Sequence, residues 1–134
     1  MTAHILIVDD DPALLEALPE TLRLRMEGID VETCDSATGA LARIESSDFD
    51  AIVTDIKMPG MDGLALLSSI KERRPAIPTL LITGHSERDL AVRALEGGAY
   101  DYISKPIDRD YFIGTLERAI RTRKLREEGQ RAGA

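Results

Sequence analysis

The sequence predicts an α/β fold in which helices cover both faces of a parallel β-sheet. Five short apolar runs recur at intervals of about 20 to 25 residues, at positions 4–8, 30–34, 51–54, 78–82 and 100–103. Amphipathic segments with helical spacing lie between these runs. A strand–helix alternation with such short connections gives right-handed crossovers and a doubly wound sheet.

The five apolar runs have the composition of buried strands. Ile and Val dominate the first run (4–8) and the third (51–54), and apolar and polar residues hardly alternate in them. Such continuous apolar runs are typical of parallel strands that are covered on both faces.

The segments between the runs carry the spacing and the end signals of helices. Apolar stripes at i, i+3, i+4 and i+7 are formed by Ala37, Ala40, Leu41 and Ile44, and again by Leu64, Leu67 and Ile70. Ser36 stands where an N-cap belongs, residues 86–89 resemble a capping box beginning at Ser86, and Asp108 can cap the last helix.

The first helix should be irregular. Asp11 precedes Pro12, a residue that suits the first turn of a helix, and we interpret Asp11 as its cap. Pro19 falls inside the same helical pattern, where it removes one backbone hydrogen bond and crowds the carbonyl of Leu15. We therefore expect a kink or a break at Pro19.

Size and charge indicate one acidic domain. The 134 residues suffice for a single core, and we expect a domain at 1–128 followed by a flexible tail or the start of a linker at 129–134. Residues 1–113 carry 21 acidic and 11 basic side chains, which argues against direct nucleic-acid binding. The basic stretch from 114 onward is interpreted as a solvated helix face. No run reaches the length of a membrane span, and no targeting segment precedes the first strand, so we expect a cytoplasmic protein without membrane contact.

Acidic and polar residues follow the predicted strands. Asp9, Asp10 and Asp11 come after the first strand, Asp55 after the third, Thr83 after the fourth and Lys105 after the fifth. Ligands of open parallel sheets bind outside the carboxyl ends of the strands. Although each residue alone could be a helix cap or a surface group, we expect the set to converge at that edge.

The chemistry of this set is coherent. Several carboxylates within a few ångströms repel one another unless a cation neutralises them. Oxygen ligands without His or Cys favour Mg²⁺ over zinc, and Mn²⁺ could replace it. An aspartate beside such an ion can act as a nucleophile toward phosphorus and form an acyl phosphate. The ammonium of Lys105 and the hydroxyl of Thr83 could then meet the charge on the phosphoryl oxygens.

The motifs at these positions resemble a known family. Ile5-Leu6-Ile7-Val8-Asp9-Asp10-Asp11, Asp55-Ile56-Lys57-Met58-Pro59-Gly60-Met61-Asp62-Gly63, Thr83-Gly84 and Lys105-Pro106 together resemble, in order, the signature of response-regulator receiver domains. The resemblance covers roughly residues 3 to 125. It implies a flavodoxin-like (βα)5 three-layer sandwich with strand order 2-1-3-4-5.

The resemblance also implies a role for each position. Asp55 would be the phosphoacceptor, with Thr83 meeting the phosphoryl group and Lys105 pairing with it. Mg²⁺ would be held by Asp10, Asp55 and the backbone carbonyl of Lys57, and by Asp9 through water. Thr83 and the aromatic Tyr102 would form the switch, and the Lys105–Pro106 bond would be cis.

Three positions near the expected site are variable or unusual. Gly84 stands where the family most often has Ala, which leaves less cover over an acyl phosphate. Lys57 and His85 lie two residues after Asp55 and Thr83, beside the path of an attacking water. We expect Lys57, Gly84 and His85 to tune the lifetime of the phosphoryl group.

The implied function is a signalling switch that does not turn over an external metabolite. A sensor histidine kinase or a phosphotransfer protein would supply the phosphoryl group, and the face of the fourth helix, fifth strand and fifth helix would change its partner preference. That face or the fifth helix could form a homodimer, and an output domain could follow in a longer protein. Three alternatives are a pseudo-receiver that works without phosphorylation, an aspartate-nucleophile phosphatase and a flavodoxin-like cofactor carrier. The phosphatase needs an acid where this chain has Lys57, and the three aspartates at 9–11 would repel a cofactor phosphate.

Overall fold

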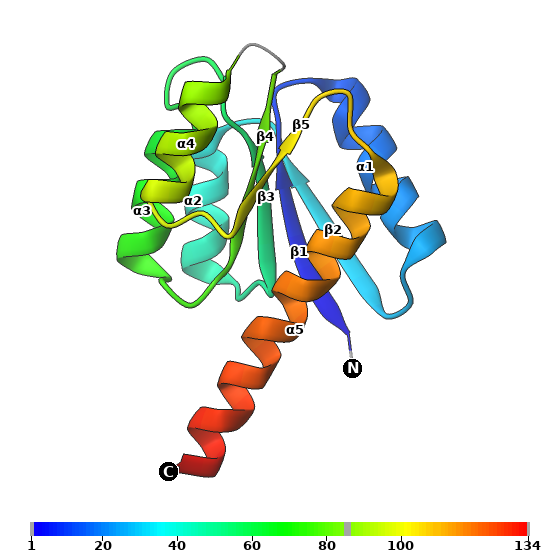
Figure 1. The fold of residues 1–134 in the computed structure, drawn as a ribbon, viewed down its shortest axis with the longest axis vertical. Coiled ribbons are helices and arrows are strands. Elements are labelled where there is room, and N and C mark those ends of the chain that lie inside the picture. The colour runs from blue at the N-terminus through cyan, green and yellow to red at the C-terminus, as the bar shows by residue number, and fades with distance from the viewer. Residues whose placement is uncertain (1, 85–86, 134) are drawn as a thin grey trace.

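The computed structural model describes residues 2–84 and 87–133, and its sheet has five parallel strands (Figure 1). The strands are β1 (Ala3–Val8), β2 (Ile29–Cys34), β3 (Ala51–Asp55), β4 (Thr79–Thr83) and β5 (Asp101–Ser104). Their order in the sheet is β2-β1-β3-β4-β5, and all pairs are parallel. The predicted doubly wound fold and strand order are confirmed, and every predicted strand boundary lies within one residue of the observed one.

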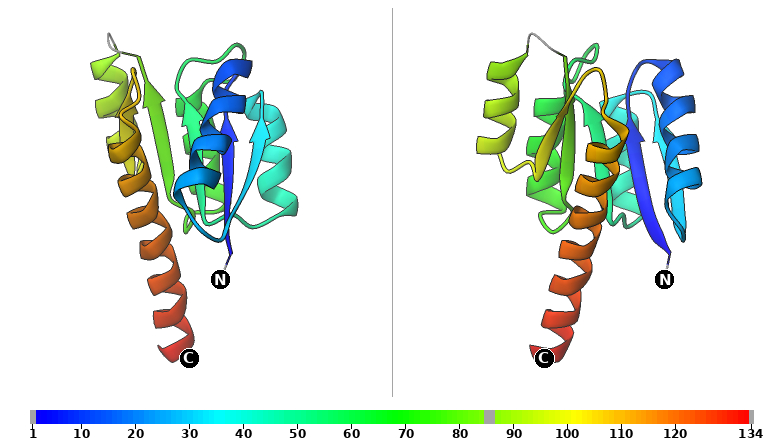
Figure 2. Two further views of the ribbon diagram at one scale, coloured as in Figure 1. Left: turned by 90° about the vertical axis from the view of Figure 1, so that its right-hand side faces the viewer. Right: turned by 45° about the vertical axis from the view of Figure 1, so that its right-hand side comes forward.

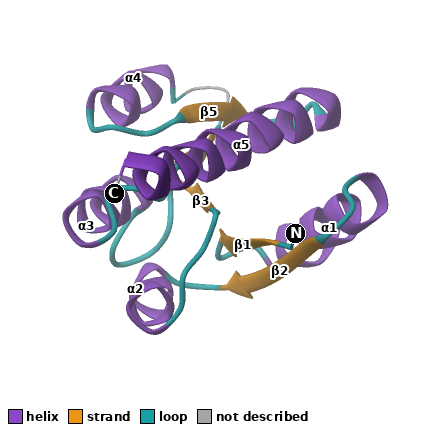
Figure 3. Cartoon of the chain, turned by 90° about the horizontal axis from the view of Figure 1, so that it is seen from below, coloured by secondary structure: helices purple, strands orange, loops and turns teal. Residues whose placement is uncertain are grey.

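Five helices cover the two faces of this sheet. They are α1 (Pro12–Arg25), α2 (Ala37–Ser46), α3 (Gly63–Arg73), α4 (Arg88–Glu96) and α5 (Arg109–Gly133). Seen along the sheet, α1 and α5 lie on one face and α2, α3 and α4 on the other (Figure 3). The molecule therefore has three layers.

Alternate residues of each strand supply the cores on the two faces. Ile5 and Ile7 of β1 pack with α1 and α5, whereas Leu6 and Val8 pack with α2 and α3. Leu81 of β4 belongs to a third cluster, beneath α3 and α4. Each central strand is buried on both sides, which explains its continuous apolar sequence.

The helix ends largely follow the predicted caps. The side chains of Asp11 and Ser36 accept hydrogen bonds from Ala13 N and Gly39 N, and Asp108 accepts one from Tyr111 N. The helix α1 runs without a break from Pro12 to Arg25 although Pro19 lies inside it, so the expected break was wrong. The predicted start of α4 was also wrong, because the N-cap is Glu87 and its side chain makes no capping bond; Ser86 lies outside the described residues.

Helix α5 is longer than the strands on which it packs. Its second half projects beyond the amino ends of the strands (Figures 1 and 2), and it continues through residue 128 to Gly133. The interpretation of its basic residues as a solvated face was wrong for Arg123, which is buried against Asp48 and Phe49. None of the helices in the described part of the chain is both long enough and apolar enough to cross a membrane.

Candidate functional site

The residues predicted to follow the strands meet at the carboxyl edge of the sheet, at the top of Figure 1. Asp55 is the last residue of β3 and pairs in register with Ile82, next to Thr83 at the end of β4. Asp9 follows β1, and Lys105 follows β5, where its N–H donates to the carbonyl of Thr83 at 2.8 Å. The parallel strands thus bring together residues that are up to 96 positions apart.

Three carboxylates form the acidic part of this site. One oxygen each of Asp9, Asp10 and Asp55 lies within 4.8 Å of the others, the only such group with His, Cys, Asp or Glu donors among the residues described. Asp9 and Asp55 are buried, whereas Asp10 is exposed. The cluster was predicted from the three aspartates that follow β1 and the one that ends β3.

The pKa of Asp9 is shifted within this cluster. Burial raises its pKa to about 6, the hydrogen bond from Asp11 N to its Oδ1 opposes the shift, and the charge of Asp55 adds to it. Its Oδ2 is buried and has no hydrogen-bond partner in the described part of the chain. A buried, unpartnered carboxylate oxygen is expensive unless a further group binds it.

A hard divalent cation fits this arrangement. All three donors are carboxylate oxygens from one exposed and two buried residues, and one buried oxygen has no hydrogen-bond partner among the described residues. Oxygen-only sites of this charge favour Mg²⁺ or Mn²⁺. The residues present therefore match the ion that the sequence predicted.

Lys105 provides the positive charge of the site. Its Nζ lies 3.3 Å from Oδ2 of Asp55. Burial alone would lower the pKa of Lys105, but the charge of Asp55 and the hydrogen bond to it raise that pKa overall. The ammonium therefore stays protonated beside the carboxylate, where it can also meet a second anion.

The loop after β3 is shaped by glycines. Gly60 has a positive φ of 73°, and Gly63 N donates to the carbonyl of Ile56 at 2.7 Å. A Cβ on Gly63 would lie only 2.2 Å from the backbone carbonyl oxygen of Asp55. This close approach gives Gly63 a positioning role that the sequence reasoning missed, although the residue belongs to the quoted motif.

The contacts of the Glu87 side chain near the site were also not predicted from the sequence. Its Oε2 accepts a hydrogen bond from Gly84 N at 2.8 Å, and its Oε1 lies 3.3 Å from Nζ of Lys57. In the sequence, only the position of Glu87 three residues after Gly84 indicated this contact. Glu87 was instead interpreted as part of a capping box at residues 86–89.

The remaining predicted positions have different outcomes. Tyr102 is half-buried on β5 and packs against the cluster of Ile56, Leu67, Leu81 and Ala94. The Lys105–Pro106 bond is cis, as expected. Lys57 is largely exposed, and His85 lies outside the described residues.

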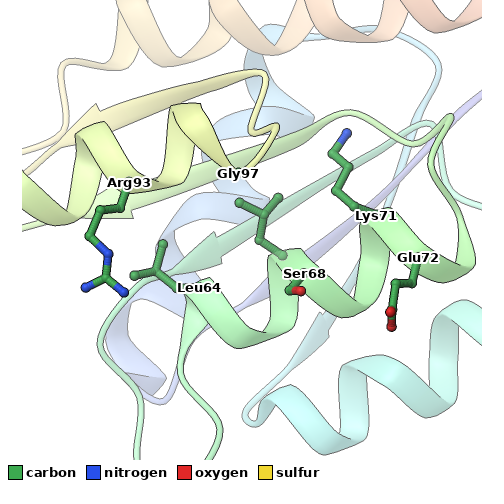
Figure 4. Close-up of a pocket in the computed structure, with 7 residues that line it drawn as sticks. Leu64, Ser68, Lys71, Glu72, Arg93 and Gly97 are labelled. Atoms are coloured by element: carbon green, nitrogen blue, oxygen red, sulfur yellow. The ribbon is translucent and has the colours of Figure 1, made fainter.

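The cavity between α3 and α4 is separate from this site (Figure 4). It is lined by Leu64, Leu67, Ser68, Lys71, Glu72, Arg93 and Gly97. None of these residues belongs to the acidic cluster or is the lysine paired with it.

The fold and the site together define a class of protein. A doubly wound sheet with a cluster of carboxylates and a paired lysine at its carboxyl edge is the arrangement of a phosphotransfer signalling module. The sequence matches the response regulator receiver domain family over residues 5–117. The chain belongs to this family, whose members are signalling modules and do not turn over metabolites.

Relatives and solved structures agree with this assignment. The chain is 42% identical over 123 residues to the C4-dicarboxylate transport transcriptional regulatory protein DctD of Pseudomonas aeruginosa, covering 91% of this chain and 26% of that protein. It is 42% identical over 114 residues to the DNA-binding transcriptional regulator NtrC of Salmonella typhimurium, covering 85% and 24%. The chain therefore spans about a quarter of the length of these relatives.

Two solved structures show the same fold. A response regulator receiver domain protein from Clostridium thermocellum superimposes with a TM-score of 0.86 at 31% identity, covering 92% of this chain and 98% of that one. NtrX from Brucella abortus, in complex with ADP, gives a TM-score of 0.88 at 39% identity, covering 97% of this chain and 30% of that one.

Proposed function

We propose that residues 1–128 are a phosphoacceptor domain in which Asp55 takes a phosphoryl group from a sensor histidine kinase or a phosphotransfer protein. The observation that carries this proposal is the position of Asp55, whose Oδ2 lies 3.3 Å from Nζ of Lys105 and whose carboxylate borders those of Asp9 and Asp10. A nucleophile between a cation and further metal-ligating carboxylates suits phosphoryl transfer.

In the proposed reaction a P–N bond is exchanged for a P–O bond. A carboxylate oxygen of Asp55 attacks the phosphorus of phosphohistidine, and the imidazole leaves with the electrons of the broken bond. Lys105 and the hydroxyl of Thr83 bind phosphoryl oxygens and hold them for an in-line approach. The domain thus assists its own phosphorylation, and slow hydrolysis returns it to the starting state.

Mg²⁺ completes the proposed site, with Mn²⁺ as a substitute. Asp10, Asp55 and the carbonyl of Lys57 would hold it directly, and Asp9 through water. When bound, the ion neutralises charge on the carboxylates and the phosphoryl oxygens. The unpartnered Oδ2 of Asp9 supports this assignment.

The proposed output is a change at the face of α4, β5 and α5. Phosphorylation would draw Thr83 and Tyr102 toward the site and alter which partner this face prefers. Leu95 of α4 and Tyr111 of α5 are exposed on these elements, which suits a homodimer or contact with an output domain. The continuation of α5 beyond 128 supports 129–134 as the start of a linker in a longer, cytoplasmic regulator.

Intact-mass measurement tests this function. The protein is incubated with acetyl phosphate and Mg²⁺, and we expect a gain of one phosphoryl group of about 80 Da. Asp55→Asn should abolish the gain, while Asp30→Asn, which removes an exposed carboxylate at the opposite edge, should keep it. A wild-type protein that never gains this mass would instead be a pseudo-receiver.

A further inference from the structure

The carboxylate of Glu87 turns back from α4 toward the site. Although Glu87 is the N-cap of α4, its side chain makes no bond to that helix. It binds Gly84 N at 2.8 Å and lies 3.3 Å from Nζ of Lys57, and only 11% of the side chain is exposed. One carboxylate thus bridges the loop after β4 and the loop after β3.

The charges around Glu87 hold it as an anion. The hydrogen bond from Gly84 N lowers its pKa, burial opposes this, and Lys57 and the charge of Lys105 lower it further. Lys105 is also the partner of Asp55. Glu87 and Asp55 therefore lie in the field of the same ammonium group.

The absence of a side chain at position 84 makes room for this contact. A Cβ on Gly84 would lie 3.1 Å from Oε1 and 3.2 Å from Cδ of Glu87. Such a contact is tight enough to push the carboxylate away by a few tenths of an ångström. The missing side chain at Gly84 is thereby matched to the position of Glu87.

We propose that the Glu87 carboxylate competes with the incoming phosphoryl group for hydrogen-bond donors of the site and thereby slows phosphoryl transfer to Asp55. Before phosphorylation this carboxylate accepts a hydrogen bond from Gly84 N–H and pairs with the Lys57 ammonium. On phosphorylation the phosphoryl group binds these two donors in place of Glu87. This inference rests on the proposed function of Asp55.

The physical basis is competition between two anions for one set of donors. The phosphoryl group carries charge on three oxygens that each need a donor. Gly84 N–H comes directly after Thr83, and Lys57 comes two residues after Asp55. A carboxylate already bound to both donors must release them, and its own charge repels the arriving phosphoryl group. Because α4 begins at Arg88, the release also acts on the first turn of the helix that leads to the proposed output face.

The neutral variant Glu87→Gln tests this competition. We expect its phosphorylation by acetyl phosphate and Mg²⁺, followed by intact mass, to be roughly threefold to tenfold faster than that of the wild type, since an ion pair and a charge-assisted hydrogen bond no longer oppose it. Glu96→Gln removes an exposed charge from the same helix and should leave the rate unchanged. A rate for Glu87→Gln equal to or below that of the wild type would overturn the proposal.

Two further measurements separate this role from a structural one. In metal-free protein, the amide NMR signal of Gly84 should shift in Glu87→Gln and stay in place in Glu96→Gln; an unmoved signal contradicts the contact. Gly84→Ala should accelerate phosphorylation in the wild type and add little to Glu87→Gln, whereas equal acceleration in both backgrounds would contradict the coupling. If the wild type takes up no phosphoryl group at all, it is the proposed function that fails.

Discussion

The two edges of the sheet shift the pKa of an aspartate in opposite directions. At the carboxyl edge, burial and the charge of Asp55 raise the pKa of Asp9 to about 6, against the hydrogen bond from Asp11 N. At the amino edge, burial also acts on Asp48, but the hydrogen bonds and charges of Arg123 and Arg74 lower its pKa. One edge gathers like charges and the other pairs opposite ones.

The ion pairs at the amino edge of the sheet, here called the paired edge, attach α5 to the rest of the domain. Arg123 of α5 contacts both carboxylate oxygens of Asp48 at 2.9 Å and donates to the carbonyl of Phe49, and Arg74, the C-cap of α3, binds the same aspartate. These three charged groups thus all have protein partners. At the carboxyl edge, Oδ2 of Asp9 is buried and has no hydrogen-bond partner among the residues that the structure describes, as expected where a ligand supplies the missing partner.

The largest expected effect comes from the backbone of the carboxyl edge. Gly63→Ala would place a methyl group 2.2 Å from the carbonyl oxygen of Asp55 and 2.7 Å from Cα of Ile56. Since backbone atoms cannot move aside cheaply, we expect the free energy of unfolding to fall by about 3 kcal/mol or more. Urea denaturation followed by circular dichroism measures this.

Gly114→Ala is the matched control for Gly63→Ala. A Cβ at Gly114, within α5, meets only the end of the Arg118 side chain at 3.5 Å. We expect its stability to be unchanged or higher by up to about 1 kcal/mol. Equal losses in the two variants would show that the contact with Asp55 is not the cause.

Removing the unpartnered charge should stabilise the protein. The folded-state pKa of Asp9, about 6, lies above the ordinary 3.8. Stability is therefore greatest while Asp9 is protonated in both states, below about pH 4, and falls as the pH rises through 6. In the presence of EDTA, Asp9→Asn should gain about 1 to 3 kcal/mol at pH 7.5 and almost nothing at pH 4.

The exposed neighbour Asp10 provides the control for this measurement. Asp10→Asn removes the same charge from the cluster without relieving a buried group, so its gain at pH 7.5 should be smaller. Equal gains in Asp9→Asn and Asp10→Asn would mean that general repulsion, and not burial of Asp9, sets the cost. A loss of stability in Asp9→Asn would contradict the raised pKa.

Much of the fold and part of the carboxyl-edge site could be predicted from the sequence. The five strands and the doubly wound sheet followed from apolar runs and short connections, and the convergence of Asp9, Asp55, Thr83 and Lys105 followed from where parallel strands end. These inferences needed only local patterns and topology, whereas the strand order was implied by the resemblance to receiver domains.

Contacts that depend on side-chain direction did not follow from the sequence. Glu87 had the spacing of a helix cap, yet it turns toward Gly84 and Lys57. The pairing of Arg123 with Asp48 joins residues 75 positions apart. Because the sequence does not show which residues lie opposite a helix, its basic face was interpreted as exposed to solvent. A periodic pattern identifies the face of an element and not the direction in which one long side chain leaves it.

The smallest expected effect comes from breaking the paired edge with Arg123→Met. Because Asp48 is 57% exposed, the ion pair is largely screened, and most of the loss comes from the buried carbonyl of Phe49, which loses its donor. We expect the free energy of unfolding to fall by about 1 to 2 kcal/mol. The pKa of Asp48 is lowered on folding, so the contribution of the pair is present above about pH 4 and is lost as the pH falls further.

Urea denaturation between pH 3 and pH 7 checks this final prediction. The difference between wild type and Arg123→Met should be constant from pH 5 to 7 and shrink toward pH 3, the reverse of the profile expected for Asp9→Asn. Arg126→Met removes an exposed charge from the same helix and should change stability by less than about 0.5 kcal/mol. A difference that grows toward low pH would mean that Asp48 does not gain its stability from Arg123, and the contrast between the two edges would then rest on Asp9 alone.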